Sequence, residues 1–394
     1  MIGEGFTSRL NWRPLGRSLL VIALMASEMF GATDGDSLAA NCVNPVYGAL
    51  TCSTSSCHGG AAEKSRQYVI WSQRDVHSRS YATLGTARSA RMAEALGIKD
   101  PLTDRRCTTC HAPIATVETG LVMPGAKASE GVSCVSCHGP LEGWLRNHTR
   151  SDYTHADRVA AGMRDLRDLN SRANACVACH QNIDPALVNV GRHPALTFEL
   201  DGQTQEQPKH WREPEGRSGA QAWFVGQAVA WREMSWGLRQ GHLDTQRELP
   251  RWRALGWLIH RAEFDRKPDG FGWESQEVTP TDLALAEEKA RQLARRGADT
   301  WTPENTIRVL TKLAHTSADF RAVSPSLLQA SRAERLVLAF DRLLAALPPD
   351  PRKPEASSQL DRLFRLAQSI PDFSPSDFAR ELDIFAQKLK PLLN

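Results

Sequence analysis

The sequence has no long apolar run after residue 40, no large excess of charge of one sign and no low-complexity segment. Its 48 Lys and Arg residues against 45 Asp and Glu residues leave a formal net charge of +3, which gives no reason to expect a nucleic-acid-binding protein. The 27 Gly and 22 Pro among 394 residues exclude a collagenous chain. A membrane-spanning helix needs about 20 apolar residues, so the mature chain is expected not to span a membrane.

Residues 1–39 have the pattern of an export signal. Arg9, Arg13 and Arg17 precede a short apolar stretch at residues 19–26, and small residues follow it, which is the order of a secretory leader. Because the apolar stretch is short for a bilayer span, cleavage after export is favoured over the alternative, an N-terminal anchor in the inner membrane. Both interpretations place the body of the protein in the periplasm.

Eight of the nine cysteines form four pairs, and histidine follows the second cysteine of each pair. Three pairs have the spacing Cys-x-x-Cys-His. In the first pair of the chain, four residues instead of two separate the cysteines. Two such thiols add across the vinyl groups of one porphyrin, and the next imidazole reaches the iron from the same side. The sequence therefore predicts four covalently attached haem c groups. The attachment residues are Cys52 and Cys57, Cys107 and Cys110, Cys134 and Cys137, and Cys176 and Cys179, and the proximal iron ligands are His58, His111, His138 and His180.

Other uses of paired cysteines fit this pattern less well. Structural zinc sites use Cys-x-x-Cys pairs but need no histidine directly after every pair. Disulfides suit an exported protein, yet a repeated Cys-x-x-Cys bridge is typical of redox enzymes, which lack the repeated histidine. Iron–sulfur clusters need a clustered third thiol, which separated pairs do not supply. The ninth cysteine, Cys42, has no role that the sequence indicates.

Three further histidines are predicted as distal iron ligands. Four motifs within residues 52–180 give one haem in about 32 residues, so the haem groups must lie close together and fill much of the core. His77 follows the first motif within Trp71–Tyr81, a stretch expected to form an amphipathic helix. His148 and His193 follow closely after the third and fourth motifs. A second histidine makes a haem iron six-coordinate and suited to electron transfer.

Five segments together resemble the cytochrome c-554 family, tetrahaem cytochromes of bacterial nitrogen metabolism. The resemblance covers roughly residues 41–212, somewhat under half of the chain, and the Gly-Val-Ser-Cys block is its most specific part. The segments that carry it are Trp71–His77 followed by Tyr81-Ala-Thr-Leu, Cys107–Ala112, Gly131–Pro140, Cys176–His180, and the turn from His193 to Leu200.

The resemblance implies three haems with two histidine ligands each and one five-coordinate haem, arranged as stacked pairs. It places the open iron at the second motif and the three distal ligands on His77, His148 and His193. His155 and His210 are the alternatives if a fourth distal ligand exists. The redox partner that the resemblance implies, in ammonia oxidisers, is a hydroxylamine-oxidising enzyme. The C-terminal extension has no counterpart in the small family members.

The expected fold is mainly α: a haem-packed multihaem cytochrome c core followed by an all-α domain. A polar Pro- and Gly-rich stretch at residues 213–219 marks the predicted boundary, which divides a tetrahaem domain at 40–212 from a C-terminal helical domain at 213–394. Later helices are expected to begin at Ser-Pro or Thr-Pro pairs, where a hydroxyl cap precedes a proline. These pairs are Thr279-Pro280, Thr302-Pro303, Ser324-Pro325 and Ser374-Pro375.

Six tryptophans lie between Trp211 and Trp257. Helix packing is the preferred interpretation, and aromatic cover for exposed haem edges is the alternative. Trp223, Gln227 and Trp231 recur at four-residue spacing, which predicts that they share one helix face.

The sequence thus predicts a periplasmic tetrahaem c-type cytochrome that transfers electrons between periplasmic redox proteins. The donor and acceptor are not identified by the sequence. Two alternatives stay open. In one, a five-coordinate haem binds and reduces nitric oxide or a related nitrogen species. In the other, the chain is a haem subunit of a larger respiratory complex.

Overall fold

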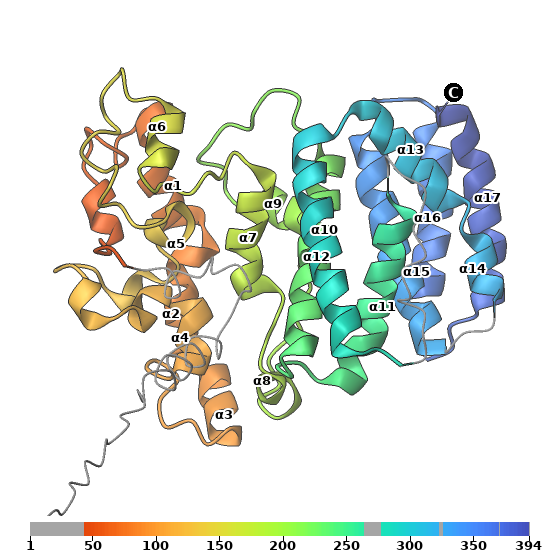
Figure 1. The fold of residues 1–394 in the computed structure, drawn as a ribbon, viewed down its shortest axis with the longest axis horizontal. Helices are drawn as coiled ribbons and strands as arrows, with labels where there is room; N and C mark the ends of the chain where they lie inside the picture. Colours follow the sequence, from red (N-terminus) through yellow and green to blue (C-terminus); the bar gives the residue numbers. More distant parts are fainter. Residues whose placement is uncertain (1–42, 264–276, 323–325, 370, 394) are drawn as a thin grey trace, which may run out of the picture. The chain divides into compact units, whose positions relative to one another are not determined.

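In the computed structural model, the described residues are 43–263, 277–322, 326–369 and 371–393. Helices are their only extended regular structure, beside one isolated bridge between Val46 and Val122 (Figure 1). The mainly α fold class is therefore confirmed. The expected export signal at residues 1–39 and Cys42 lie outside the described residues.

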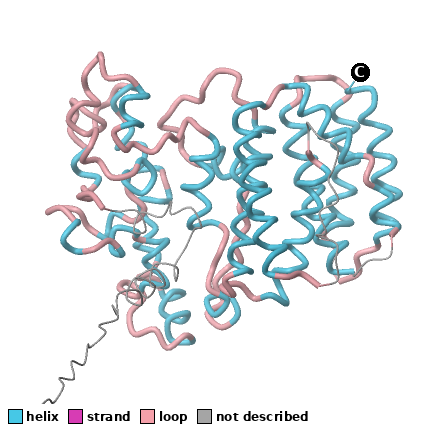
Figure 2. Tube along the Cα trace, viewed as in Figure 1, coloured by secondary structure: helices cyan, strands magenta, loops and turns pink. Residues whose placement is uncertain are grey.

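The segment that carries the cysteine motifs consists of short helices joined by loops (Figure 2). Its α-helices are α1 (Gln67–Arg74), α2 (Ser80–Thr83), α3 (Ala87–Ala95), α4 (Arg105–His111), α5 (Cys134–His138), α6 (His155–Ala160), α7 (Leu169–His180), α8 (Pro185–Asn189) and α9 (Leu200–Glu206). Its 3₁₀-helices are η1 (Ala49–Cys52), η2 (Glu63–Ser65), η3 (Val76–Arg79), η4 (Pro113–Thr116), η5 (Thr119–Leu121) and η6 (Ala128–Glu130).

Longer helices dominate after residue 218. They are α10 (Gly219–Arg239), α11 (Thr245–Arg261), α12 (Pro280–Thr300), α13 (Pro303–Ala314), the short α14 (Ser317–Arg321), α15 (Ser326–Ala346), α16 (Lys353–Ala367) and α17 (Pro375–Leu393). Among the described residues, no helix is both long and apolar enough to cross a bilayer.

The hydroxyl–proline pairs begin helices as predicted. The Thr279 hydroxyl accepts from the Asp282 amide and the Asp282 carboxylate accepts from the Thr279 amide, which satisfies two backbone donors at the start of α12. Thr302 precedes α13, and the Ser374 hydroxyl accepts from the Asp377 amide at the start of α17. The fourth pair, Ser324-Pro325, lies outside the described residues.

Helix α10 is the central element of the C-terminal half. Every residue from Ala220 to Leu238 is buried, because α10 packs against α7, α9, α11, α12 and α15. Trp223, Gln227 and Trp231, predicted to share one face, therefore lie on one of several buried faces of α10. A Cβ on Gly226 would lie 2.7 Å from Leu200 Cβ, so this glycine lets α10 approach α9 closely.

Four of the clustered tryptophans lie inside this helical core, which supports the helix-packing interpretation for them. They are Trp223, Trp231, Trp252 and Trp257, each at most 1% exposed. The indole N–H of Trp252 donates to Ser235 Oγ at 2.7 Å, so the burial of its polar atom is compensated.

The buried apolar side chains form two clusters of very different size. The larger extends from Leu169 in α7 to Leu389 in α17. The smaller has six buried members between Val46 and Trp144, in the segment that holds the first three cysteine motifs. Such a small apolar cluster fits a segment in which porphyrins are expected to complete the core. The described residues belong to one compact unit, and the domain boundary at 212–213 stays a prediction.

Candidate haem-binding site

Three of the four cysteine motifs lie at the end of a helix. The second and third motifs end α4 and α5, and the fourth ends α7. In these helices the two cysteines are three residues apart and so lie on one face. Asp104 and Asp168 cap the starts of α4 and α7, which stabilises these helices at the end opposite the histidine. The first motif, with its wider spacing, begins at Cys52, the last residue of η1, and continues through a series of turns.

The eight paired cysteines are free thiols, with no disulfide among the described residues. Those residues also hold no cluster of three His, Cys, Asp or Glu side chains arranged for a metal ion. Thiols of different motifs meet. A hydrogen bond with the Cys134 thiol lowers the pKa of Cys52, and a hydrogen bond with the Cys179 thiol lowers the pKa of Cys110. The first motif therefore lies beside the third, and the second beside the fourth.

Three of the predicted proximal histidines each lie close to one of the predicted distal histidines. The ring centroids are 6.1 Å apart for His58 and His148, 6.1 Å for His77 and His180, and 6.4 Å for His111 and His193. Metal–imidazole bonds are about 2 Å long, so two rings on opposite sides of one metal ion have centroids roughly 6 Å apart. All three pairs therefore have the separation that one shared iron requires.

In all six of these rings, Nδ1 is occupied by a protein partner. This leaves Nε2 for a metal, the usual arrangement of histidine ligands, whose other nitrogen is held by a carboxylate or carbonyl. The partners of Nδ1 are Gln67 for His58, Leu145 for His148, Asp75 for His77, Gln203 for His180, Ser80 and Thr83 for His111, and Pro194 for His193.

Comparison with known proteins points to the same cofactor. Residues 51–139 match the sequence profile of the family described as cytochrome c554 and c-prime. This region belongs to the cytochrome c554 family. Cytochrome c-554 of Nitrosomonas europaea is 27% identical over 197 residues, which cover 47% of this chain and 78% of the relative. No solved structure matches the chain. Membership of this region in a multihaem cytochrome family implies covalently attached haem and electron transfer.

The turn that carries His77 differs from the prediction. A continuous helix was expected over Trp71–Tyr81, but α1 ends at Arg74 and a 3₁₀ turn follows. The reason is Asp75, whose carboxylate accepts from both the backbone N–H and the Nδ1 of His77, at 3.0 and 2.8 Å. Burial acts to raise the pKa of Asp75, but hydrogen bonds from His77 and Gln207 outweigh it and lower the pKa to about 2. The carboxylate that orients His77 is therefore ionised at neutral pH.

The other two candidate histidines of the c554 region have different surroundings. His155 uses its Nε2 to contact Asp165 Oδ1 at 2.9 Å, so this nitrogen is already engaged. His210 has a buried Nδ1 without a hydrogen-bond partner and packs edge-on against Trp211. Burial, together with the charges of neighbouring groups that include His210, lowers the pKa of His138 to about 4. His210 is thus a histidine close to the third motif.

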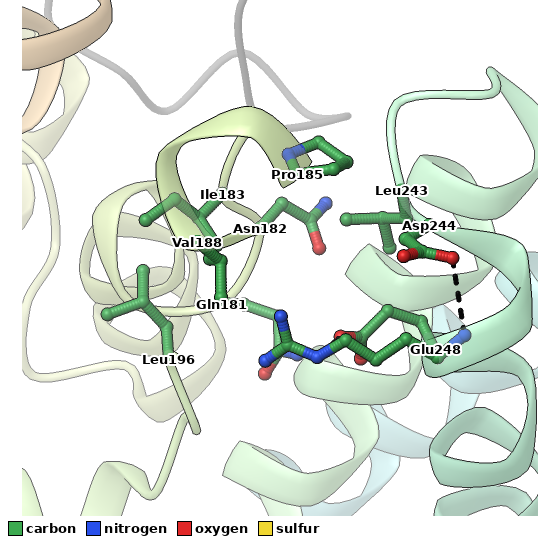
Figure 3. Close-up of a pocket in the computed structure, with 10 residues that line it drawn as sticks. Gln181, Asn182, Ile183, Pro185, Val188, Leu196, Leu243, Asp244 and Glu248 are labelled. Atoms are coloured by element: carbon green, nitrogen blue, oxygen red, sulfur yellow. Dashed lines mark hydrogen bonds and ion pairs between the residues drawn. The ribbon is translucent and has the colours of Figure 1, made fainter. Parts of the chain in front are cut away.

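One small pocket lies directly after the fourth motif (Figure 3). Residues between Gln181 and Leu196 line one side, and residues from Leu243 to Glu248 at the start of α11 line the other. The lining contains no histidine and no cysteine, so it offers neither an iron ligand nor a thioether position.

The residues that hold Nδ1 were missed by the sequence analysis. Gln67 lies nine residues after His58, and Asp75 lies two residues before His77. Both are close enough in sequence to be found by inspecting the neighbours of each histidine. Gln203 lies 23 residues after His180, and no local signal pointed to it. The residues of the c554 region thus fit haem c at three motifs, with ligands and ligand-orienting groups both present.

Proposed function

We propose that this chain is a periplasmic tetrahaem c-type cytochrome that carries electrons between redox proteins. Haem c supplies an iron that alternates between ferric and ferrous states. The observation that carries the proposal is the set of three histidine pairs, spaced for one iron each and held through Nδ1. Two histidine ligands favour electron transfer because they leave the iron no open position. Export is supported by the leader pattern of residues 1–39.

The pairs give an iron-by-iron assignment. The first-motif iron takes His58 and His148, the second-motif iron His111 and His193, and the fourth-motif iron His180 and His77. This differs from the family pattern, which leaves the second-motif iron five-coordinate. The proximity of His193 to His111, at 6.4 Å between centroids, supports the change.

For the third-motif iron the proposed distal ligand is His210. The other histidines favoured from the sequence face different motifs, and His155 has its Nε2 on Asp165. His210 remains near His138, and its Nδ1 is buried. With this ligand all four irons are six-coordinate, which favours an electron carrier over reduction of a nitrogen species.

The contacts between motifs support electron transfer within the chain. The Cys52 and Cys134 thiols meet, as do those of Cys110 and Cys179, so the haems of the first and third motifs are neighbours, and likewise those of the second and fourth. Short helices α4 and α5 both contact α7. Four closely spaced irons provide a multi-electron store and a conducting path.

Electron paramagnetic resonance on the oxidised protein tests this proposal. We expect four haems by pyridine haemochrome and two kinds of low-spin signal among the three paired irons. The ring planes are inclined by 83° for His77 and His180 and by 77° for His111 and His193, but by only 20° for His58 and His148. Near-perpendicular ligand planes give highly anisotropic low-spin signals, and near-parallel planes give a rhombic one.

Fewer than four haems would contradict the cofactor number. A high-spin signal from one haem in four that disappears with nitric oxide would contradict the fourth ligand. It would favour the alternative in which a small nitrogen oxide binds an open iron.

A second prediction concerns His210 alone. His210→Ala is expected to convert one haem from low to high spin, because the third-motif iron loses its distal ligand. The optical and magnetic spectra check this, and His242→Ala is the matched control, since His242 packs on Trp236 in the helical half. Spectra of His210→Ala identical to those of the wild type would remove His210 from the ligand set.

A further inference from the structure

Helix α9 reaches both histidines of the fourth-motif pair. Gln203 Nε2 lies 3.3 Å from His180 Nδ1. One turn later Gln207 Nε2 donates to Asp75 Oδ2 at 3.0 Å, and Asp75 Oδ1 accepts from His77 Nδ1 at 2.8 Å. Gln207 is the residue directly after α9, and its amide donates to Gln203 O at 3.1 Å. The C-terminal end of α9 thus contacts His180 directly and His77 through Asp75.

The Gln203 side-chain amide can be flipped so that its oxygen, instead of its nitrogen, faces His180. A histidine that binds iron through Nε2 carries its proton on Nδ1, which then needs an acceptor. The Gln203 Oε1 is buried without a partner, and amide oxygen and nitrogen positions are interchangeable by a flip. The flipped amide presents Oε1 to the Nδ1–H of His180, and Nε2 gives up its 3.5 Å contact with the Thr197 carbonyl.

The C-terminal helical half holds α9 in place. Asp201 is 3% exposed, and its Oδ2 pairs with Arg342 of α15 at 3.1 Å. At the start of the helix, Glu199 accepts from Gln227 of α10 at 2.8 Å. Leu200 packs on Gly226, where a Cβ would lie only 2.7 Å from Leu200 Cβ. Both α10 and α15 therefore fix the position of α9.

We propose that α9 is a clamp through which the helical half fixes both axial ligands of the fourth-motif iron, and that Asp75 lowers the reduction potential of this iron. The inference rests on the proposed function, because it takes His77 and His180 as ligands of one iron. A carboxylate that accepts from Nδ1–H raises the basicity of the imidazole, which favours ferric over ferrous iron. Asp75, Gln203 and Gln207 are thus positioning residues that act through the two histidines.

Asp75→Asn tests the electronic part of the proposal. Asparagine keeps the size and an acceptor oxygen but removes the charge. In a potentiometric titration of the four-haem protein, one midpoint potential is expected to rise while the other three stay in place. One highly anisotropic low-spin signal should change with it. The matched control is Gln67→Leu, which removes the Nδ1 partner of His58 and should alter the rhombic signal instead.

Arg342→Met tests whether the helical half fixes the position of α9, at a residue that does not contact either histidine. It removes the cation that pairs with Asp201, so α9 loosens and the same anisotropic signal is expected to shift or broaden. Arg380→Met is the control, because Arg380 pairs with Asp377 on the exposed face of α17 and should leave all haem signals unchanged.

Unchanged potentials and spectra in Asp75→Asn would overturn the proposed role of Asp75. Unchanged spectra in Arg342→Met would overturn the role of the helical half. These failures are distinct from failure of the proposed function, which would already appear in the wild type as missing haem or missing six-coordinate signals.

Discussion

Replacing His193 with alanine is expected to convert one haem of the four from low to high spin and to open its iron to nitric oxide. The His193 ring lies 6.4 Å from that of His111. Its orientation is fixed on both sides, because Nδ1 contacts the Pro194 carbonyl at 2.9 Å and the His193 amide donates to Leu187 O at 2.8 Å. Alanine removes the ligand and leaves space on one axial side of the iron. Electron paramagnetic resonance before and after nitric oxide measures both effects.

His155→Ala is the matched control. His155 is a half-buried histidine of the same region, but its Nε2 contacts Asp165 at 2.9 Å, so all haem signals should stay as in the wild type. An unaltered spectrum in His193→Ala would return the second-motif iron to the five-coordinate state of the family pattern. His77→Ala and His148→Ala should each give one high-spin haem as well, at the fourth and first motifs.

The parts of the fold that depend on residues close together in the sequence could be predicted from the sequence. Hydroxyl–proline pairs marked the starts of α12, α13 and α17. At α12 and α17 the hydroxyl accepts from a backbone N–H of the first turn. At α13 Thr302 makes no such bond, and the proline at the first helical position marks the start. The complete burial of α10 could not be predicted in this way. It depends on α7, α9, α12 and α15, which come from distant parts of the chain, and the spacing of Trp223, Gln227 and Trp231 records only one of the faces that they cover.

The types of ligand were predictable, but their pairing was not. Cysteine spacing identified the attachment sites, and closeness in sequence to a motif singled out His77, His148 and His193. However, His77 follows the first motif and faces His180 of the fourth, whereas His148 follows the third and faces His58 of the first. The link from Gln207 to Asp75 spans 132 positions. Such contacts are set by how segments pack, which a single sequence does not record.

Trp252→Ala is expected to destabilise the helical half strongly without changing any haem signal. Trp252 is fully buried, its ring centroid lies 6.1 Å from that of Trp231, and its N–H donates to Ser235. Truncating a buried tryptophan costs about 3–5 kcal/mol through lost apolar contact and the cavity left behind. The midpoint of guanidinium unfolding, followed by far-ultraviolet circular dichroism, measures the loss, and the resonance spectrum reports the haems.

Trp211→Ala separates the two interpretations of the tryptophan cluster. Trp211 is only partly buried and donates to Glu213 Oε1 at 2.6 Å, under the Arg172 guanidinium, and it packs against His210. Its loss should cost less stability than that of Trp252 and should affect the third-motif haem. If Trp252→Ala instead altered a haem signal while leaving the unfolding midpoint in place, Trp252 would cover a haem edge. Both its complete burial and its bond to Ser235 favour the stability effect, because they tie Trp252 to α10 rather than to a motif.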